Sequence, residues 1–132
     1  MLTCSGDMAV VLVVNDDNDM LSVYESVLTA MGHRPVTKLG VESGSETVRE
    51  VGAEALLIDL QRPDEDDYGL RIIEEVRTDP ELSGLPIILC SGAPEAMRPL
   101  EDRLVGLRVP IVVKPFSLIE LEDTLARALR RS

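Results

Sequence analysis

The chain has 132 residues, and its 24 acidic side chains outnumber its 13 basic ones, which gives a formal net charge of −11. A chain of this length is expected to form one domain around a single core, and its negative charge disfavours direct binding to nucleic acids or anionic membranes. With two tyrosines, one phenylalanine and no tryptophan, it also offers little aromatic surface on which bases could stack.

The first predicted element is a buried strand. Residues 9–14 form an apolar, β-branched run that stops at the acidic turn 15–17. Beyond this turn, apolar side chains recur at helical spacing and predict a helix over about 18–31. Gly32 stands where such a helix would end in a left-handed conformation, and His33, the only histidine, is expected to have a capping or surface role there.

The next three segments continue the alternation of strands and helices. Residues 33–39 predict a second strand and residues 43–51 a second helix, whose Ser-x-x-Glu spacing at 43–46 is typical of a capping box. The run 55–60 is apolar almost throughout, which is typical of a parallel strand that is buried on both faces. One carboxylate, Asp59, lies near the end of this strand.

The second half of the chain repeats the pattern. Two further apolar runs, at 86–91 and 109–113, predict the fourth and fifth strands. Apolar residues at helical spacing predict helices over about 70–79, 95–104 and 117–129. The chain therefore reads as five strand–helix pairs.

This alternation predicts an α/β fold of the (βα)5 type, a doubly wound parallel sheet with helices on both faces. In such sheets ligands bind at the carboxyl ends of the strands. Each polar residue at a strand end, taken alone, would be unremarkable, but four predicted strands end in groups able to do chemistry. These groups are Asn15-Asp16-Asp17, Asp59, Ser91 and Lys114.

Carboxylates that converge at one edge need a cation. Two of them within a few ångströms repel each other by about 4 kcal/mol at an effective dielectric constant of about 20. Oxygen ligands at a solvated site suit Mg²⁺, which takes one or two carboxylates and keeps several waters. Asp16 and Asp59 are the predicted carboxylate ligands, and Asn15 or Asp17 would act through water.

The remaining two groups indicate phosphoryl chemistry. Lys114 supplies a mobile charge that could pair with Asp59 and then with a phosphoryl oxygen, and Ser91 could donate a hydrogen bond to another such oxygen. A carboxylate beside Mg²⁺, a lysine and a hydroxyl is typical of phosphoryl transfer in which the carboxylate becomes an aspartyl phosphate. We therefore expect Asp59 to be the nucleophile.

Four segments at these strand ends carry a family resemblance: Val13–Asp17, Leu57–Pro63, Ile88–Gly92 and Val113–Phe116. Together they resemble the receiver domain of two-component response regulators, the CheY-like superfamily. The resemblance covers about residues 10–130. It implies a flavodoxin-like fold with the strand order 2-1-3-4-5.

The resemblance also implies roles for individual residues. Asp59 would accept a phosphoryl group from a histidine kinase or a histidine phosphotransfer protein, and Ser91 and Lys114 would bind the phosphoryl oxygens. Mg²⁺ would be held by Asp16, Asp59 and the backbone carbonyl of Gln61. Phosphorylation would then switch a protein-interaction surface around the fourth helix, the fifth strand and the fifth helix.

Several features depart from the family pattern. Asn15 replaces the first residue of the usual acidic pair, which should weaken Mg²⁺ binding, and Ile111 replaces the usual aromatic switch residue. The loop over 63–69 is longer and more acidic than usual. These departures leave open an alternative, an atypical receiver that acts as a phosphorylation-independent interaction or dimerisation module.

Other expectations concern the cellular role. The domain is expected at 9–131, after a flexible tail at 1–8. No enzymatic turnover beyond self-phosphorylation and autodephosphorylation is expected, because phosphatases of similar topology need an Asp where Gln61 stands. A cytoplasmic protein is expected, since the sequence shows neither a signal peptide nor a membrane span. Its partners would be a kinase and an unknown downstream protein, and it would be a monomer or a weak homodimer.

Overall fold

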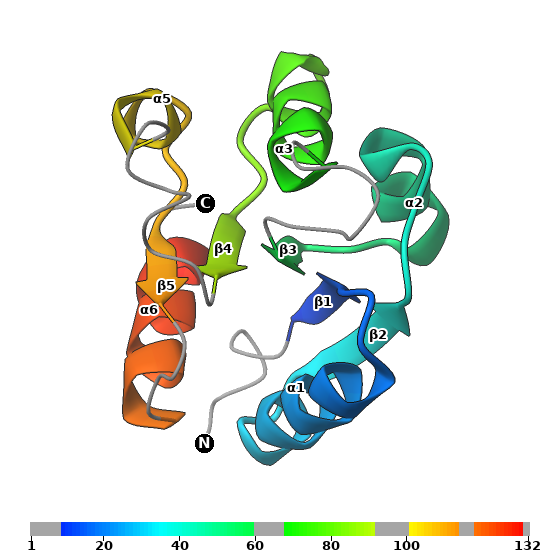
Figure 1. The fold of residues 1–132 in the computed structure, drawn as a ribbon, viewed down its shortest axis with the longest axis vertical. Coiled ribbons are helices and arrows are strands. Elements are labelled where there is room, and N and C mark those ends of the chain that lie inside the picture. The colour runs from blue at the N-terminus through cyan, green and yellow to red at the C-terminus, as the bar shows by residue number, and fades with distance from the viewer. Residues whose placement is uncertain (1–8, 60–67, 92–100, 114–117, 131–132) are drawn as a thin grey trace.

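All five strands of the central sheet run parallel, in the order β2-β1-β3-β4-β5 (Figure 1). The computed structural model describes residues 9–59, 68–91, 101–113 and 118–130. The predicted (βα)5 architecture and strand order are confirmed. The strands are β1 (Val10–Val14), β2 (Arg34–Lys38), β3 (Ala55–Asp59), β4 (Ile87–Ser91) and β5 (Ile111–Val113).

Helices cover both faces of this sheet (Figure 1). α1 and α6 pack on one face, whereas α2, α3 and α5 pack on the other, so the domain has three layers. This arrangement follows from right-handed crossovers between parallel strands. The described helices are α1 (Asn18–Ala30), α2 (Gly44–Val51), α3 (Tyr68–Thr78), α5 (Glu101–Gly106) and α6 (Leu118–Arg130).

Most boundaries lie within two residues of the predicted ones. The predicted fourth helix, over 95–104, is an exception, because the described part, α5, begins at Glu101 and continues to Gly106. Its predicted first part lies outside the described residues. The fifth strand is also shorter than predicted, since it begins at Ile111 and not at Val109. The sheet register explains this difference, because Ile111 is the first residue of β5 to pair with β4.

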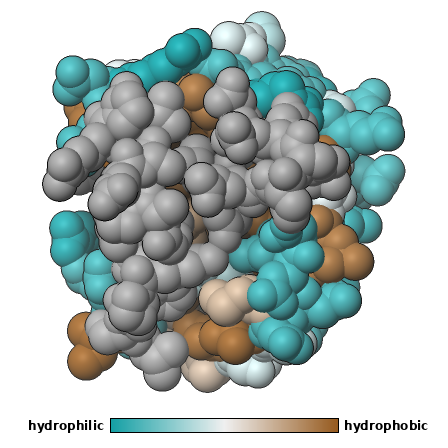
Figure 2. All heavy atoms as spheres, in the orientation of Figure 1, coloured by the Kyte–Doolittle hydropathy of each residue, from teal (hydrophilic) through white to brown (hydrophobic). Residues whose placement is uncertain are grey.

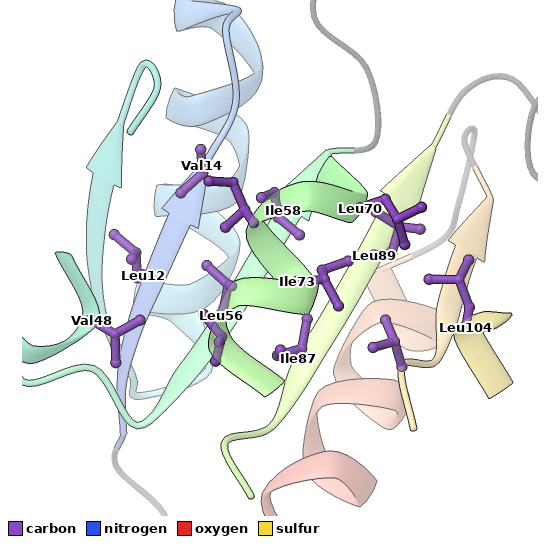
Figure 3. Close-up of a cluster of buried hydrophobic side chains, with 13 residues drawn as sticks. Leu12, Val14, Val48, Leu56, Ile58, Leu70, Ile73, Ile87, Leu89 and Leu104 are labelled. Carbon is purple, nitrogen blue, oxygen red and sulfur yellow. The ribbon is translucent and has the colours of Figure 1, made fainter. Parts of the chain in front are cut away.

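The central strands are buried on both faces, as the apolar runs predict. Leu56 and Ile58 of β3 belong to the cluster under α2, α3 and α5, which Figure 3 shows in close-up. Leu57, the residue between them, belongs to the cluster under α1 and α6. Alternate side chains of a strand point to opposite faces, so a strand between two helix layers must be apolar at consecutive positions.

The end of α1 shows why Gly32 and His33 stand where they do. Gly32 has φ +88°, and the backbone N–H of His33 donates to the carbonyl of Leu28 at 2.9 Å, which closes the helix as predicted. The side chain of His33 has more than a surface role, which corrects the expectation. It is half-buried, and its Nδ1 accepts a hydrogen bond from the backbone N–H of Ala9 at 3.1 Å, so it links the start of β1 to the start of β2.

The N-terminus of α2 is capped from two directions. The hydroxyl of Ser43 accepts a hydrogen bond from the backbone N–H of Glu46 at 3.2 Å, as the Ser-x-x-Glu spacing predicts. Glu75 of α3 adds a contact that the spacing does not predict. Its carboxylate accepts hydrogen bonds from the Ser43 hydroxyl and from the backbone N–H of Gly44, the latter at 2.9 Å. The two helices are therefore joined at this point.

Gly44 of α2 packs against α3, and Gly44→Ala is expected to lower the free energy of unfolding by about 1–3 kcal/mol. A Cβ at this position would lie 2.6 Å from Cγ2 of Ile72 and 3.2 Å from Cγ2 of Val76. Both side chains are fully buried and β-branched, so neither can rotate away easily. Urea denaturation followed by circular dichroism measures the loss.

Gly84 offers a matched control for this substitution. It also lacks a positive φ, but a Cβ there would meet no atom within 4 Å. Gly84→Ala should therefore leave the stability within about 0.5 kcal/mol of the wild type, because such surface substitutions are close to neutral. Equal losses in the two variants would contradict a steric role for Gly44.

The surface described by the structure is mostly polar. In Figure 2, many of the coloured residues around the rim of the viewed face are hydrophilic, and apolar residues lie among them in separate groups. Four large apolar side chains are exposed among the described residues: Val23, Leu39, Val105 and Ile119. No described helix has both the length and the apolar character that a membrane span requires.

Candidate functional site

The sheet register brings several predicted site positions to one edge. Because β1, β3, β4 and β5 are parallel neighbours, their carboxyl ends lie along the same side of the sheet. β3 ends with Asp59, which pairs with Cys90, and β4 ends with Ser91, which pairs with Val113 of β5. Asn15 directly follows β1. The backbone positions therefore match the edge at which such folds bind ligands.

Two of the predicted site residues, Gln61 and Lys114, lie outside the described residues. Lys114 is the residue after Val113, the last residue of β5, so the strand leads directly to it. For Asp59 and Ser91, the structure gives the place of each residue in its strand. The roles assigned to these four residues stay predictions.

The acidic turn after β1 is held in a defined shape by Asn15. This residue is 4% exposed, and its side-chain Oδ1 accepts a hydrogen bond from the backbone N–H of Asp17 at 2.9 Å. Its own backbone N–H donates to the carbonyl of Lys38 at 3.1 Å, which extends the pairing between β1 and β2 by one residue. If this amide oxygen also accepted a hydrogen bond from a metal-bound water, it would do so in addition to the bond from the Asp17 N–H.

The two aspartates of the turn have different surroundings. Asp17 is the N-cap of α1, and its Oδ1 accepts a hydrogen bond from the backbone N–H of Asp19 at 2.9 Å. Asp16 is exposed, and its backbone lies between the buried Asn15 and this cap. The turn therefore leaves Asp16 available to solvent at the carboxyl edge, beside the end of β3, which is the neighbour of β1.

The donor groups at this edge fit a hard cation. The candidate ligands are oxygens of carboxylates, and Mg²⁺ at a solvated site prefers carboxylate and water oxygens. Asp16 and Asp59 follow neighbouring strands, so two carboxylate-bearing residues occupy adjacent positions on one edge. Asn15 contributes no charge, which leaves this part of the site less negative than a pair of acidic residues would make it.

Sequence reasoning missed the contribution of β2 to the site. The carbonyl of Lys38 anchors the backbone of Asn15 and so helps to shape the acidic turn. A contact made by a main-chain carbonyl leaves no mark on residue type, so no sequence pattern could have revealed it. Ile111 also has a place that the sequence did not show, since its half-buried side chain packs against the cluster under α2, α3 and α5.

Comparison with known proteins agrees with this geometry, although no protein-family model matches the chain. The probable transcriptional regulator ycf27 of Guillardia theta is 31% identical over 125 residues, which cover 92% of this chain and 46% of that protein. The protein of the same name from Porphyra purpurea is also 31% identical, over 92% of this chain and 48% of its own length. The chain thus spans about half the length of these relatives.

Solved structures share the fold over nearly the whole chain. The chemotaxis protein CheY4 of Vibrio cholerae superposes with a TM-score of 0.76 at 21% identity, covering 92% of this chain and 98% of that one. The receiver domain of a sensor histidine kinase from Pseudomonas aeruginosa gives a TM-score of 0.71 at 25% identity, with the same two coverages. That domain is described with a magnesium ion coordinated in its active-site cleft.

The class of protein follows from the fold and the relatives together. The parallel sheet in the order 2-1-3-4-5 is a flavodoxin-like architecture, here with an acidic turn after the first strand and an aspartate at the end of the third. In its fold and in the residues at its strand ends, the chain resembles the receiver domains of two-component response regulators.

Proposed function

We propose that the chain is a receiver domain of a two-component response regulator and that it acts as a phosphorylation switch. It takes a phosphoryl group from a histidine kinase or a histidine phosphotransfer protein onto Asp59, in a reaction that requires Mg²⁺. The observation that carries the proposal is the sheet register, which puts Asp59, Ser91 and the turn with Asp16 along one carboxyl edge. The resemblance to receiver domains at the same positions supports it.

The chemistry requires few groups. A carboxylate oxygen of Asp59 forms a bond to phosphorus while the phosphorus–nitrogen bond of the donor's phosphohistidine breaks, and the leaving imidazole takes up a proton. Ser91 and Lys114 bind phosphoryl oxygens. Asp16, Asp59 and the carbonyl of Gln61 would hold Mg²⁺, which when bound neutralises charge as the phosphoryl group is transferred.

The output is a change in binding to another protein. Val105 of α5 is 75% exposed and Ile119 of α6 is 76% exposed, so both helices that flank β5 carry an exposed apolar side chain. Exposed apolar groups of this kind suit a weak, reversible contact with a partner or with a second copy of the chain. The relatives are named transcriptional regulators, but the part that they share with this chain is this domain alone. We place this role in the cytoplasm.

Acetyl phosphate provides a direct test, since it donates a phosphoryl group without a kinase. In the presence of Mg²⁺, the intact protein should gain one phosphoryl group by mass spectrometry. Removal of Mg²⁺ with EDTA should abolish the adduct, because the charge on the phosphoryl group and the carboxylates would then be uncompensated. The absence of an adduct, both with acetyl phosphate and with candidate histidine kinases, would contradict the proposal.

A second function is favoured by one observation, the engagement of Asn15 in the turn in place of an acidic residue. A site with one carboxylate fewer binds Mg²⁺ less tightly, which would suit an interaction module that works without phosphorylation. The two functions differ in a measurable way. A module of this second kind would bind its partner equally well before and after treatment with acetyl phosphate and Mg²⁺.

A further inference from the structure

A pocket lies at the opposite edge of the sheet from the carboxyl ends. It has a volume of about 420 Å³ and lies where β4 and β5 begin, between the segments that precede these strands and the last turns of α6. This volume falls within the range of small-molecule sites. Arg77, Arg108 and Arg127 line the pocket, so a local concentration of positive charge exists in a chain with a net charge of −11.

Arg77 is the half-buried arginine of the three. Its guanidinium donates hydrogen bonds to the carbonyls of Leu107 at 2.7 Å and Leu85 at 2.5 Å, with longer bonds to the carbonyls of Ser83 and Arg108. All these acceptors are neutral. Burial lowers the pKa of Arg77, and the nearby charge of Arg108 lowers it further. Burial and the neighbouring guanidinium thus both disfavour the charged form of Arg77, and an anion bound nearby would favour it.

Arg108 adds a second charge without a carboxylate partner among the described residues. Its backbone has φ +60°, which is unusual for a residue other than glycine, and its Nη2 donates to the carbonyl of Ser83 at 2.9 Å. Arg127 differs from both, because it forms an ion pair with Asp123 that raises its pKa. Arg77 and Arg108 are thus the two uncompensated cations at the pocket, within the part of the chain that the structure describes.

The rest of the lining is largely apolar. Leu85, Pro86, Ile111 and Ala128 contribute to it beside the arginines. Specific small-molecule sites combine an apolar wall with a few polar groups that fix the orientation of the ligand, and an arginine fork matches the oxygens of a carboxylate or a phosphate. This pocket has both the apolar wall and the arginine side chains.

We propose that this pocket binds a small organic anion, whose carboxylate or phosphate group contacts Arg108 at the mouth and whose apolar body lies against Leu85 and Ile111. The negative charge of the remaining protein does not prevent this, since charges more than a Debye length away, about 8 Å at physiological ionic strength, are largely screened. The site is separate from the phosphoryl site, which lies at the other edge of the sheet, and it does not depend on the proposed function.

Two simple probes test the site: phenyl phosphate and benzoate, which combine an anionic group with an apolar ring. Titration of isotope-labelled protein should shift the backbone amide signals of Gly84, Leu85 and Arg108 in NMR spectra. Arg108→Gln should weaken binding at least about ten-fold, since hydrogen bonds to a charged group contribute about 1.5–3 kcal/mol. Arg108→Lys, which keeps the charge but loses the fork, should bind with intermediate affinity.

Arg103→Gln is the matched control, because it removes the same charge from an exposed arginine that is paired with Glu74 outside the pocket. Its affinity for both probes should equal that of the wild type. The proposal is overturned if neither probe binds at millimolar concentration, or if Arg108→Gln binds as well as the wild type. Signal shifts confined to the carboxyl edge, around Asn15 and Asp16, would overturn it too, since they would place the anion at the other site.

Discussion

Asp59→Asn is expected to eliminate phosphoryl transfer to the chain. An amide differs little from a carboxylate in size, so the last residue of β3 should keep its pairing with β4. The amide lacks the anionic oxygen that attacks phosphorus, however, so no acyl phosphate can form. Incubation with acetyl phosphate and Mg²⁺, followed by intact mass spectrometry, should show no adduct on this variant and one phosphoryl group on the wild type.

Asp19→Asn is the control for this experiment. It removes one carboxylate from the first turn of α1, which begins just after the acidic turn, and it leaves the N-cap Asp17 in place, so α1 should remain capped. This variant should still accept a phosphoryl group. An adduct on Asp59→Asn, located by peptide mapping on any other side chain, would assign the acceptor role to that residue instead.

Arg77→Met should lower the free energy of unfolding by about 2–4 kcal/mol. Methionine fills much of the same space as the stem of arginine but donates no hydrogen bond. The carbonyls of Leu85 and Leu107, which belong to the segments before β4 and β5, would each lose a charged donor. Part of this loss is offset because methionine, unlike arginine, buries no charge. Urea denaturation measures the net change in the free energy of unfolding.

Arg103→Met separates this effect from a general effect of losing an arginine. Arg103 is exposed and forms an ion pair with Glu74, and such surface pairs contribute about 0–1 kcal/mol. A loss below about 1 kcal/mol in Arg77→Met, equal to that in Arg103→Met, would show that the two segments hold their shape without the guanidinium.

The sheet was predictable from the sequence because each central strand lies between two helix layers. Burial on both faces requires apolar residues at consecutive positions, and this produces the runs that end at Val14, Asp59 and Ser91. Ser43 was predictable as a cap for a similar reason, since its partner, the N–H of Glu46, lies only three residues away. Local spacing encodes such contacts directly.

Contacts between distant segments were not predictable in this way. Glu75 reaches Ser43 across 32 residues, and Arg77 reaches Leu107 across 30, so neither pairing follows from local spacing. The position of His33 is of the same kind, because its half-buried ring accepts a hydrogen bond from Ala9, at the start of another strand. The residue types alone suggested an ordinary helix end.

The sequence by itself determined the order of the elements, the buried strands and the candidate groups Asp16, Asp59, Ser91 and Lys114 at the strand ends. These depend on periodicity and residue type, which are local properties of the chain. Only the tertiary structure decided how the acidic turn is held by Asn15 and where the arginine-lined pocket lies. Both depend on main-chain carbonyls, those of Lys38 and of the segments bound by Arg77, and every residue carries the same carbonyl.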